Sequence, residues 1–425
     1  MKKNKNLLIW NKAKNIIPNG NSFLSKNPSR FPVNNWPIYF SKAKGCEIWD
    51  LNKKKFYDFS LMGVGTNVLG YADKDVDKAV ISEIKKSNMS SLNSKFEVDF
   101  ADLLKKIHPW SSMVKFARTG AEANSIAIRL ARAYTKKNKV IVCGYHGWHD
   151  WYLSAKLSKK HNSLDTHLYK DLKIEGVNKK LRNSTYSVSY NDYTSIEKII
   201  KKDNDIACII MEVERHEKPK KNFLQSIRNI CTKKKIVLIF DECTTGFREI
   251  YGGLHLKYGI DPDMAMFGKA IGNGYAITSV LGKKKIMNFA KNTFVSSTFW
   301  SEKIGFVAGL ATLKKMKKIS AQKILKKKSL KIKRGLISLA KKHKLNIHFI
   351  GLDALITFKI NGIEDEKLNK IILSKMIGKG FLAGNRLYVS IAHADKLIKK
   401  YLASIDGIFK EIRKIIHEKK NSNNY

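Results

Sequence analysis

Short apolar runs alternate with longer amphipathic segments through the middle of the chain. Each run is too short for a helix and is bounded by polar residues or glycine, which is typical of a buried strand. Strands that alternate with helices predict a doubly wound, mostly parallel sheet, so we expect an α/β fold. The predicted strands are Met113–Phe116, Val140–Cys143, Ala207–Met211, Ile236–Phe240, Ala265–Phe267 and Thr278–Leu281.

The pattern changes on both sides of this region. Residues 1–60 predict a helix and then a β-hairpin, with a polar turn between the segments Glu47–Asp50 and Phe56–Phe59. After about residue 300, a long helix at Ile304–Lys317 leads to strands near Ile347–Ile350 and Ala354–Ile360. We therefore expect a large α/β domain at 61–300, a smaller α+β domain at 301–425, and an N-terminal segment, 1–60, that packs with the smaller domain.

Two of the predicted strands end in a charged residue. Asp241 follows one strand, and Lys269 follows the next strand along the chain. Ligands of open α/β sheets bind beyond the carboxyl ends of the strands, so both side chains could face one pocket. An amine and an acid suit pyridoxal phosphate (PLP), since the amine forms a Schiff base with the aldehyde and the acid keeps the ring nitrogen protonated.

Two turns precede these strands. Thr119, Gly120 and Ala121 open a helix, whose free amides can bind a phosphate, although such a turn is more often plain helix capping. Tyr145 and His146 follow the next strand, where an aromatic ring could lie on a planar cofactor. His146, His149 and Asp150 could instead bind a metal, but their spacing lacks the two-histidine helical zinc motif, so we expect no metal.

The net charge of +45 could indicate a nucleic-acid-binding protein. The lysines are spread through nearly every segment, which favours a general bias of composition over a single binding face, and we expect no specific nucleic-acid partner. No apolar run is long enough for a membrane span or a signal peptide. The 5 cysteines are odd in number and form no C-x-x-C pair, so we expect a cytoplasmic protein without a disulfide framework.

Motifs along nearly the whole chain resemble those of class III (fold type I) PLP-dependent aminotransferases, and among these most closely the glutamate-1-semialdehyde 2,1-aminomutases. The resemblance implies the fold of a fold type I transferase and an amino-group transfer between a small-molecule donor and a carbonyl acceptor. The motifs are Pro18–Ser22, Ala43–Gly45, Thr119–Ala123, Tyr145–Gly147, Tyr190–Asp192, Phe240–Glu242, Thr245–Arg248 and Gly268–Gly274.

The resemblance also implies a role for each matching residue. Lys269 would be the Schiff-base lysine and the base that moves the proton, and Asp241 would pair with the pyridinium nitrogen. Thr119, Gly120 and Ala121 would bind the phosphate, Tyr145 would stack on the ring, and His146 and Glu212 would complete the cofactor site. Thr298 matches a threonine that reaches the neighbouring subunit's phosphate, which implies a homodimer with its active sites at the subunit interface.

The substrate end of the pocket departs from the aminomutase pattern. Ser25 stands where the aminomutase has a carboxylate-binding Arg, and Phe299–Glu302 replaces an aromatic-Gly-Asn segment. Cys243 replaces a Val against the ring, and Arg386 is either a relocated anchor or a surface residue. We therefore expect an aminomutase-like transaminase. A sugar-derived or other carbonyl acceptor, a protein of this fold that has lost catalysis, a zinc hydrolase and, most remotely, a basic nucleic-acid-binding protein are the alternatives.

Overall fold

A computed structural model describes residues 4–31, 35–158, 164, 173–214 and 216–422. The chain forms two compact units. The smaller unit consists of residues 1–74 and 319–425, and the larger unit consists of residues 75–318. Relative to the domains expected from the sequence, residues 61–74 lie in the smaller unit and the long helix after residue 300 lies in the larger one.

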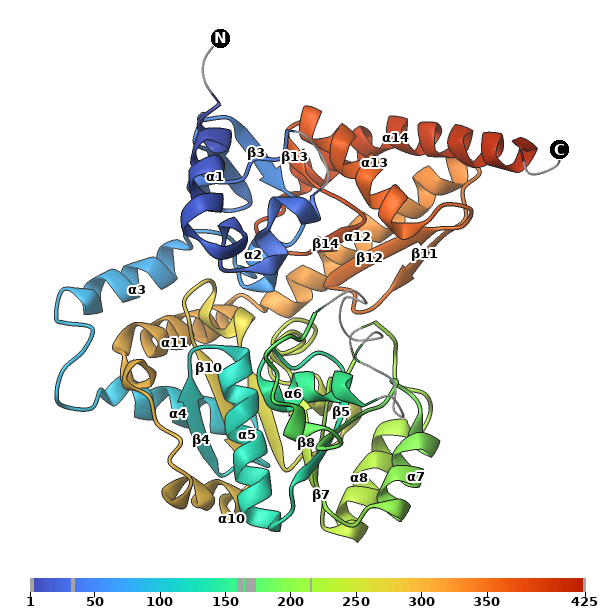
Figure 1. The fold of residues 1–425 in the computed structure, drawn as a ribbon. Helices are drawn as coiled ribbons and strands as arrows, with labels where there is room; N and C mark the ends of the chain where they lie inside the picture. Colours follow the sequence, from blue (N-terminus) through green and yellow to red (C-terminus); the bar gives the residue numbers. More distant parts are fainter. Residues whose placement is uncertain (1–3, 32–34, 159–163, 165–172, 215, 423–425) are drawn as a thin grey trace. The chain divides into compact units, whose positions relative to one another are not determined.

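The larger unit is built on a 7-stranded sheet (Figure 1). All neighbouring strands are parallel except the pairs that involve β10, which is antiparallel to both β4 and β9. In sheet order, the strands are β4 (Met113–Ala117), β10 (Thr278–Gly282), β9 (Met264–Phe267), β8 (Val237–Asp241), β7 (Ile206–Met211), β5 (Lys139–Cys143) and β6 (Thr185–Ser187).

The helices of this unit pack on the sheet through their apolar faces. The buried side of α5 includes Ala123, Ala127, Leu130 and Ala131, which belong to the same core cluster as residues of β7, β8 and β9. Figure 1 shows α7 and α8 side by side. The helices are α3 (Lys74–Ile84), α4 (Lys95–Ile107), α5 (Gly120–Thr135), α6 (Asp150–Leu153), α7 (Tyr193–Lys202), α8 (Phe223–Lys234), α9 (His255–Tyr258), α10 (Lys284–Met287) and α11 (Lys303–Lys318).

The smaller unit contains two sheets and three long helices. Its 4-stranded sheet has the order β1-β2-β3-β13, in which β13 adds a parallel strand from the C-terminal segment to the hairpin of the N-terminal segment. Its 3-stranded antiparallel sheet has the order β11-β12-β14. The elements are α1 (Lys5–Ile16), β1 (Phe40–Lys44), β2 (Glu47–Asp50), β3 (Lys55–Asp58), α2 (Met62–Gly65), α12 (Ala321–Lys342), β11 (Ile347–Ile350), β12 (Leu355–Ile360), α13 (Asp365–Gly378), β13 (Phe381–Leu382), β14 (Arg386–Tyr388) and α14 (Asp395–Ser422).

The expected α/β fold class is confirmed, and every strand predicted in the central region is present within a residue or two. Three strands of two or three residues, β6, β13 and β14, are not predicted by the sequence pattern. A strand that short carries too few positions to show an apolar run, and pairing within the sheet determines it instead.

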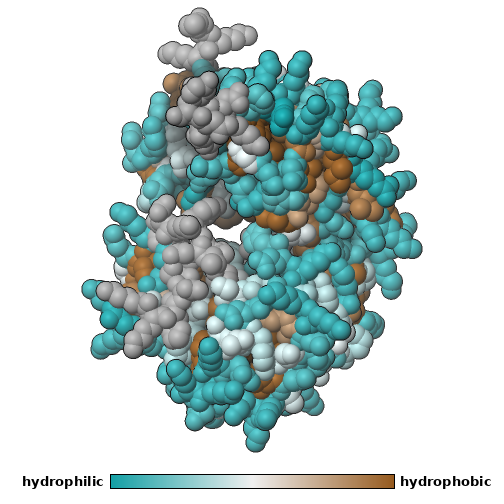
Figure 2. Space-filling model, turned by 90° about the vertical axis from the view of Figure 1, so that its right-hand side faces the viewer, coloured by the Kyte–Doolittle hydropathy of each residue, from teal (hydrophilic) through white to brown (hydrophobic). Residues whose placement is uncertain are grey.

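Over the part of the chain that the structure describes, no helix combines the length and the apolar composition that a membrane span needs. The cysteines are all free and buried. Figure 2 shows that hydrophilic residues cover most of the face in view and do not gather in one patch. This spread agrees with the even distribution of lysines along the sequence.

Candidate functional site

Asp241 is the last residue of β8, and buried donors surround its carboxylate. Asn124 Nδ2 and His146 Nδ1 each lie 2.9 Å from Oδ2, and the Cys243 amide donates to Oδ1 at 3.0 Å. Burial alone would raise the pKa of this carboxyl, but His146 and Asn124 outweigh it and lower the pKa below the usual value. Asp241 is therefore ionised, and because a carboxylate only accepts, His146 Nδ1 carries the proton between them.

Lys269 follows β9, the strand next to β8 in the sheet. Its backbone takes a left-handed conformation, with φ of 45°, just after the extended residue Gly268. Its ammonium donates to Thr244 Oγ1 at 2.6 Å. Thr244 lies three residues after Asp241, so the segments that leave β8 and β9 bring the amine and the carboxylate to one edge of the sheet, as the sequence predicts.

The turn before α5 forms a capping box. Thr119 Oγ1 accepts from the Glu122 amide, and Glu122 Oε2 accepts from the Thr119 amide at 2.8 Å. These contacts leave the amides of Gly120 and Ala121 at the start of the helix, where the first N–H groups have no intrahelical acceptor. The capping that the sequence analysis weighed against phosphate binding is thus present, and it is compatible with an anion at the next two amides.

A second turn, after β5, packs against the first. Gly147 lies so close to α5 that an added Cβ would approach Ala121 Cβ to 2.7 Å, so only glycine fits there. Tyr145 is 36% exposed, and its ring lies edge-on to that of Tyr152. Its amide donates to Glu212 Oε2 at 3.3 Å, which places Glu212, the residue just after β7, beneath this turn.

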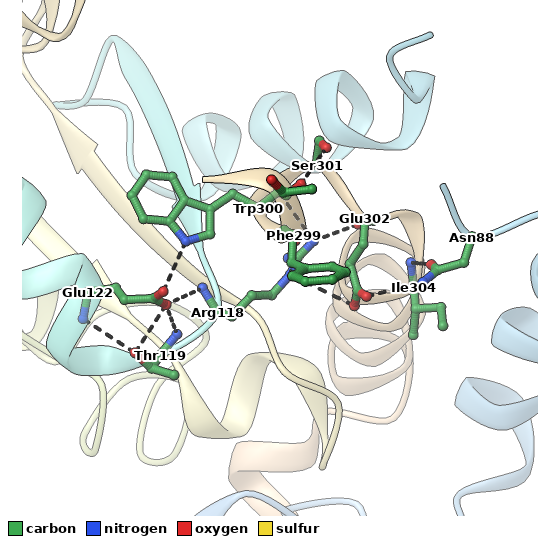
Figure 3. Close-up of polar contacts among 10 residues, drawn as sticks. Asn88, Arg118, Thr119, Glu122, Phe299, Trp300, Ser301, Glu302 and Ile304 are labelled. Carbon is green, nitrogen blue, oxygen red and sulfur yellow. Dashed lines mark hydrogen bonds and ion pairs between the residues drawn. The ribbon is translucent and has the colours of Figure 1, made fainter. Parts of the chain in front are cut away.

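Thr298 is exposed on the short 3-10 helix η9 (Thr298–Ser301). This helix follows a stretch that includes Phe294, and both Phe294 and Phe299 are exposed apolar side chains. Arg118, the residue before the capping box, donates to the backbone carbonyls of η9 and of the residue that follows it (Figure 3).

The residue after Asp241 points to the opposite face of the strand. Glu242 is fully buried, and His255 Nδ1 lies 2.8 Å from its Oε1. Trp110 Nε1 in turn donates to His255 Nε2 at 2.8 Å. Burial opposes the charge of Glu242, but the contacts with His255 lower the pKa of this carboxyl below the usual value. The strand end is therefore anchored behind the site by a buried polar network.

Two residues of this arrangement, Asn124 and Thr244, were not predicted from the sequence. Asn124 lies on the apolar face of α5, and an Asn in a row of alanines is the signal that could have found it. Thr244, the partner of Lys269, gave no signal, because a threonine after a strand is common in loops. Asn124 Oδ1 and His146 Nε2 are buried without a hydrogen-bond partner in the described structure.

Of the residues considered for metal binding, His146 is part of the site and His149 has a different partner. His149 Nδ1 contacts Ser125 Oγ, while His146 Nδ1 contacts Asp241, and in the described ranges no three His, Cys, Asp or Glu side chains gather as metal ligands would. Ser25 and Arg386 belong to the smaller unit, where Arg386 is exposed on β14.

Comparisons with known proteins agree with this geometry. Residues 30–409 match the family model for aminotransferase class-III. The chain is 32% identical over 441 residues to a glutamate-1-semialdehyde 2,1-aminomutase of Thermodesulfovibrio yellowstonii, covering 97% of this chain and 100% of that protein. It is 28% identical over 429 residues to a 3-aminobutyryl-CoA aminotransferase of Cloacimonas acidaminovorans, covering 97% and 98%. A structure of the FumI protein from Sphingopyxis sp. MTA144 in its PLP internal aldimine form has a TM-score of 0.85 at 22% identity, covering 96% of each chain.

Proposed function

The chain belongs to the class-III aminotransferases, which are PLP-dependent enzymes, and on this premise we propose that it transfers an amino group between small molecules with Lys269 as the cofactor-binding lysine. The observation that carries the proposal is the pairing of β8 with β9, which brings an ionised, buried Asp241 and the amine of Lys269 to one sheet edge.

The residues at this edge fit PLP. A carboxylate that stays ionised although it is 5% exposed suits a positively charged ring nitrogen. Gly120 and Gly268 both lie beside Cys243, since an added Cβ on either would be 3.4 Å from Cys243 Sγ, so the start of α5 and the end of β9 both approach the segment after Asp241. The uncapped amides at the start of α5 suit a phosphate group.

When bound, PLP supplies an aldehyde that links to amines and a ring that accepts electrons. Lys269 would hold the cofactor through Nζ and, once an amino donor replaced it there, would move a proton at that atom. Thr244 Oγ1 would orient Nζ through their 2.6 Å contact. Asp241 would hold the proton of the ring nitrogen, while Asn124 and His146 keep the carboxylate oriented.

The remaining assignments concern the phosphate and the ring. Thr119, Gly120 and Ala121 would bind the phosphate, and Tyr145 would stack on the ring, with Glu212 supporting the turn from below. His146 would act behind Asp241 rather than on the cofactor directly. We also propose a homodimer in which the exposed Thr298 reaches the phosphate in the partner subunit.

The substrate remains defined by class only. The relatives include both an aminomutase, which returns the amino group to the same molecule, and a transaminase, which uses separate donor and acceptor molecules. The Ser in place of an anchoring Arg at position 25 favours an aminomutase-like transaminase whose carbonyl acceptor is sugar-derived or otherwise lacks that carboxylate. The free, unpaired cysteines support a reducing compartment such as the cytoplasm.

The test is the visible spectrum of the purified protein with PLP and candidate amines. We expect a yellow band that borohydride fixes on the protein, that Lys269→Ala abolishes, and that Lys139→Ala, a change of a lysine at the far end of β5, leaves intact. Bleaching by one amine and recovery with one carbonyl compound would identify the substrates. A wild-type protein that binds no PLP, or a Lys269→Ala protein that keeps the fixed cofactor, would refute the proposal.

A further inference from the structure

Arg118 holds the 3-10 helix η9 and the residue that follows it through several hydrogen bonds at once. Its Nε donates to the Phe299 carbonyl at 2.7 Å, and its Nη2 donates to the carbonyls of Trp300 at 3.2 Å and Glu302 at 2.6 Å. Figure 3 shows the guanidinium reaching to these carbonyls from the phosphate turn, residues 118–121, where we propose that the phosphate binds. A lysine has the same charge but lacks the planar fork that makes such contacts together.

A second link joins the same two segments. Trp300 Nε1 donates to Glu122 Oε1 at 3.1 Å, while Glu122 Oε2 accepts from the amides of Arg118 and Thr119 at 3.0 and 2.8 Å (Figure 3). The capping glutamate thus binds both the start of α5 and the indole of η9. The orientation of η9 is tied to the geometry of the phosphate turn in its own subunit.

The surroundings of Arg118 are shaped to hold the guanidinium in place. Only 10% of its side chain is exposed. It lies over the ring of Phe306, with Cζ 5.1 Å from the ring centroid, and Gly305 makes room for it, since an added Cβ would approach Nη1 to 2.7 Å. Such packing holds the Arg118 side chain in one rotamer, whereas an arginine on an open surface keeps several.

We propose that Arg118, with Glu122, is a positioning residue that acts on the partner subunit's active site. It holds η9 so that Thr298 meets the phosphate bound by the partner, and the three carbonyl contacts fix the backbone on which Thr298 stands. The inference rests on the proposed function, because it needs both the cofactor and the dimer. It predicts that loss of the Arg118 side chain weakens PLP binding in the partner subunit and not in the subunit that carries the change.

Mixed dimers with one functional lysine test this directly. One subunit keeps Lys269, and the differently tagged partner carries Lys269→Ala, so that only one site can give the absorbance band of lysine-linked PLP. Arg118→Gln is placed either in the Lys269→Ala subunit or in the subunit that keeps Lys269. The readouts are the concentration of PLP that half-saturates this band and the rate of amino transfer.

We expect PLP to bind about tenfold more weakly when Arg118→Gln is in the Lys269→Ala subunit, a change equal to about 1.4 kcal/mol. In the other placement, binding should match that of the mixed dimer without the change. Arg118→Lys should give the same pattern, which would exclude a simple effect of charge. Trp300→Phe, which removes one hydrogen bond and leaves Arg118 intact, should give a weaker effect in the same placement.

Arg132→Gln is the matched control, since Arg132 lies on α5, the helix that follows Arg118, and also donates to a carbonyl, that of Asn138 at 2.7 Å. It should have no effect in either placement. A loss that follows Arg118→Gln in the subunit with Lys269, or no loss in either placement, would overturn the positioning role. A mixed dimer that shows no PLP band before any change at Arg118 would refute the proposed function instead.

Discussion

Replacement of Asp241 by Asn should separate the electrostatic role of this residue from its structural one. The carboxylate accepts two side-chain hydrogen bonds at Oδ2 and one backbone hydrogen bond at Oδ1. An amide has only one acceptor oxygen, so its NH2 group must face at least one buried donor. One unsatisfied buried donor costs about 1–3 kcal/mol, and we expect the free energy of unfolding of the cofactor-free protein to fall by about 2 kcal/mol.

The chain contains a matched control at the other end of the sheet. Asp263 precedes β9, is 7% exposed, and also accepts two hydrogen bonds at Oδ2 and one at Oδ1, from Arg228, the Leu238 amide and Lys283. Both carboxyls are buried, which opposes their charge, yet both have a pKa below the usual value. Asp263→Asn should therefore cost a similar free energy of unfolding without touching the cofactor.

Urea unfolding of both cofactor-free variants, and amino transfer by both after addition of PLP, complete the test. Asp241→Asn should lower kcat at least about a hundredfold, as removal of a preorganised charged group commonly does. Asp263→Asn should keep kcat near the wild-type value at a temperature where it is folded. Equal losses of kcat in the two variants would show that Asp241 matters only for stability.

Three further predictions concern stability and reactivity. Burial, and then the nearby His255, lower the pKa of His108 to about 4, below about 6.5 in the unfolded chain, so the unfolded state binds more protons between these values and stability falls as pH drops. From pH 7.5 to pH 5 His108 alone should contribute about 2 kcal/mol of this loss. Burial also lowers the pKa of His393 to about 4, so in urea unfolding His108→Gln should remove only its own share of the slope; an unchanged slope would contradict the assignment. Thr119→Ala should cost about 1 kcal/mol of unfolding free energy through loss of the helix cap, while Thr119→Ser should retain it, as thermal unfolding without PLP would show. Burial, and then the charge of Asp241, raise the pKa of the Cys243 thiol well above its usual value, so iodoacetamide at neutral pH should modify this thiol only in urea. Rapid modification of the folded protein would contradict this. Cys243→Val should lower the free energy of unfolding by less than about 1.5 kcal/mol.

The central sheet and the strand-end pair could be predicted because each depends on a local pattern. A run such as Ile236–Phe240 has no polar position along its length, which is typical of a parallel strand that is buried on both faces. Asp241 and Lys269 could be singled out because they follow successive predicted strands, whose carboxyl ends meet at the edge of the sheet where ligands bind. Strand order and the antiparallel direction of β10 depend on contacts between distant segments, which a local pattern does not carry.

The parts that could not be predicted depend on partners distant in sequence. Nothing near Arg118 indicates that it binds carbonyls 181 to 184 residues further along the chain. Similarly, the sequence shows Glu242 as one more charge beside Asp241, whereas the structure buries it against His255. Such side chains acquire their roles only when the fold brings their partners to them.

The alternation of Asp241 and Glu242 also limits how this gene can change. One acid serves the proposed cofactor face and the next serves the buried network, so a deletion or insertion of a single codon within β8 would misplace both. A deletion would put Glu242 at the donors arranged for Asp241 and Cys243 opposite His255, whereas an insertion would put Asp241 opposite His255 and Phe240 at those donors. We therefore expect length variation among descendants of this chain to be excluded from β8, and to occur in the loops at the opposite edge of the sheet.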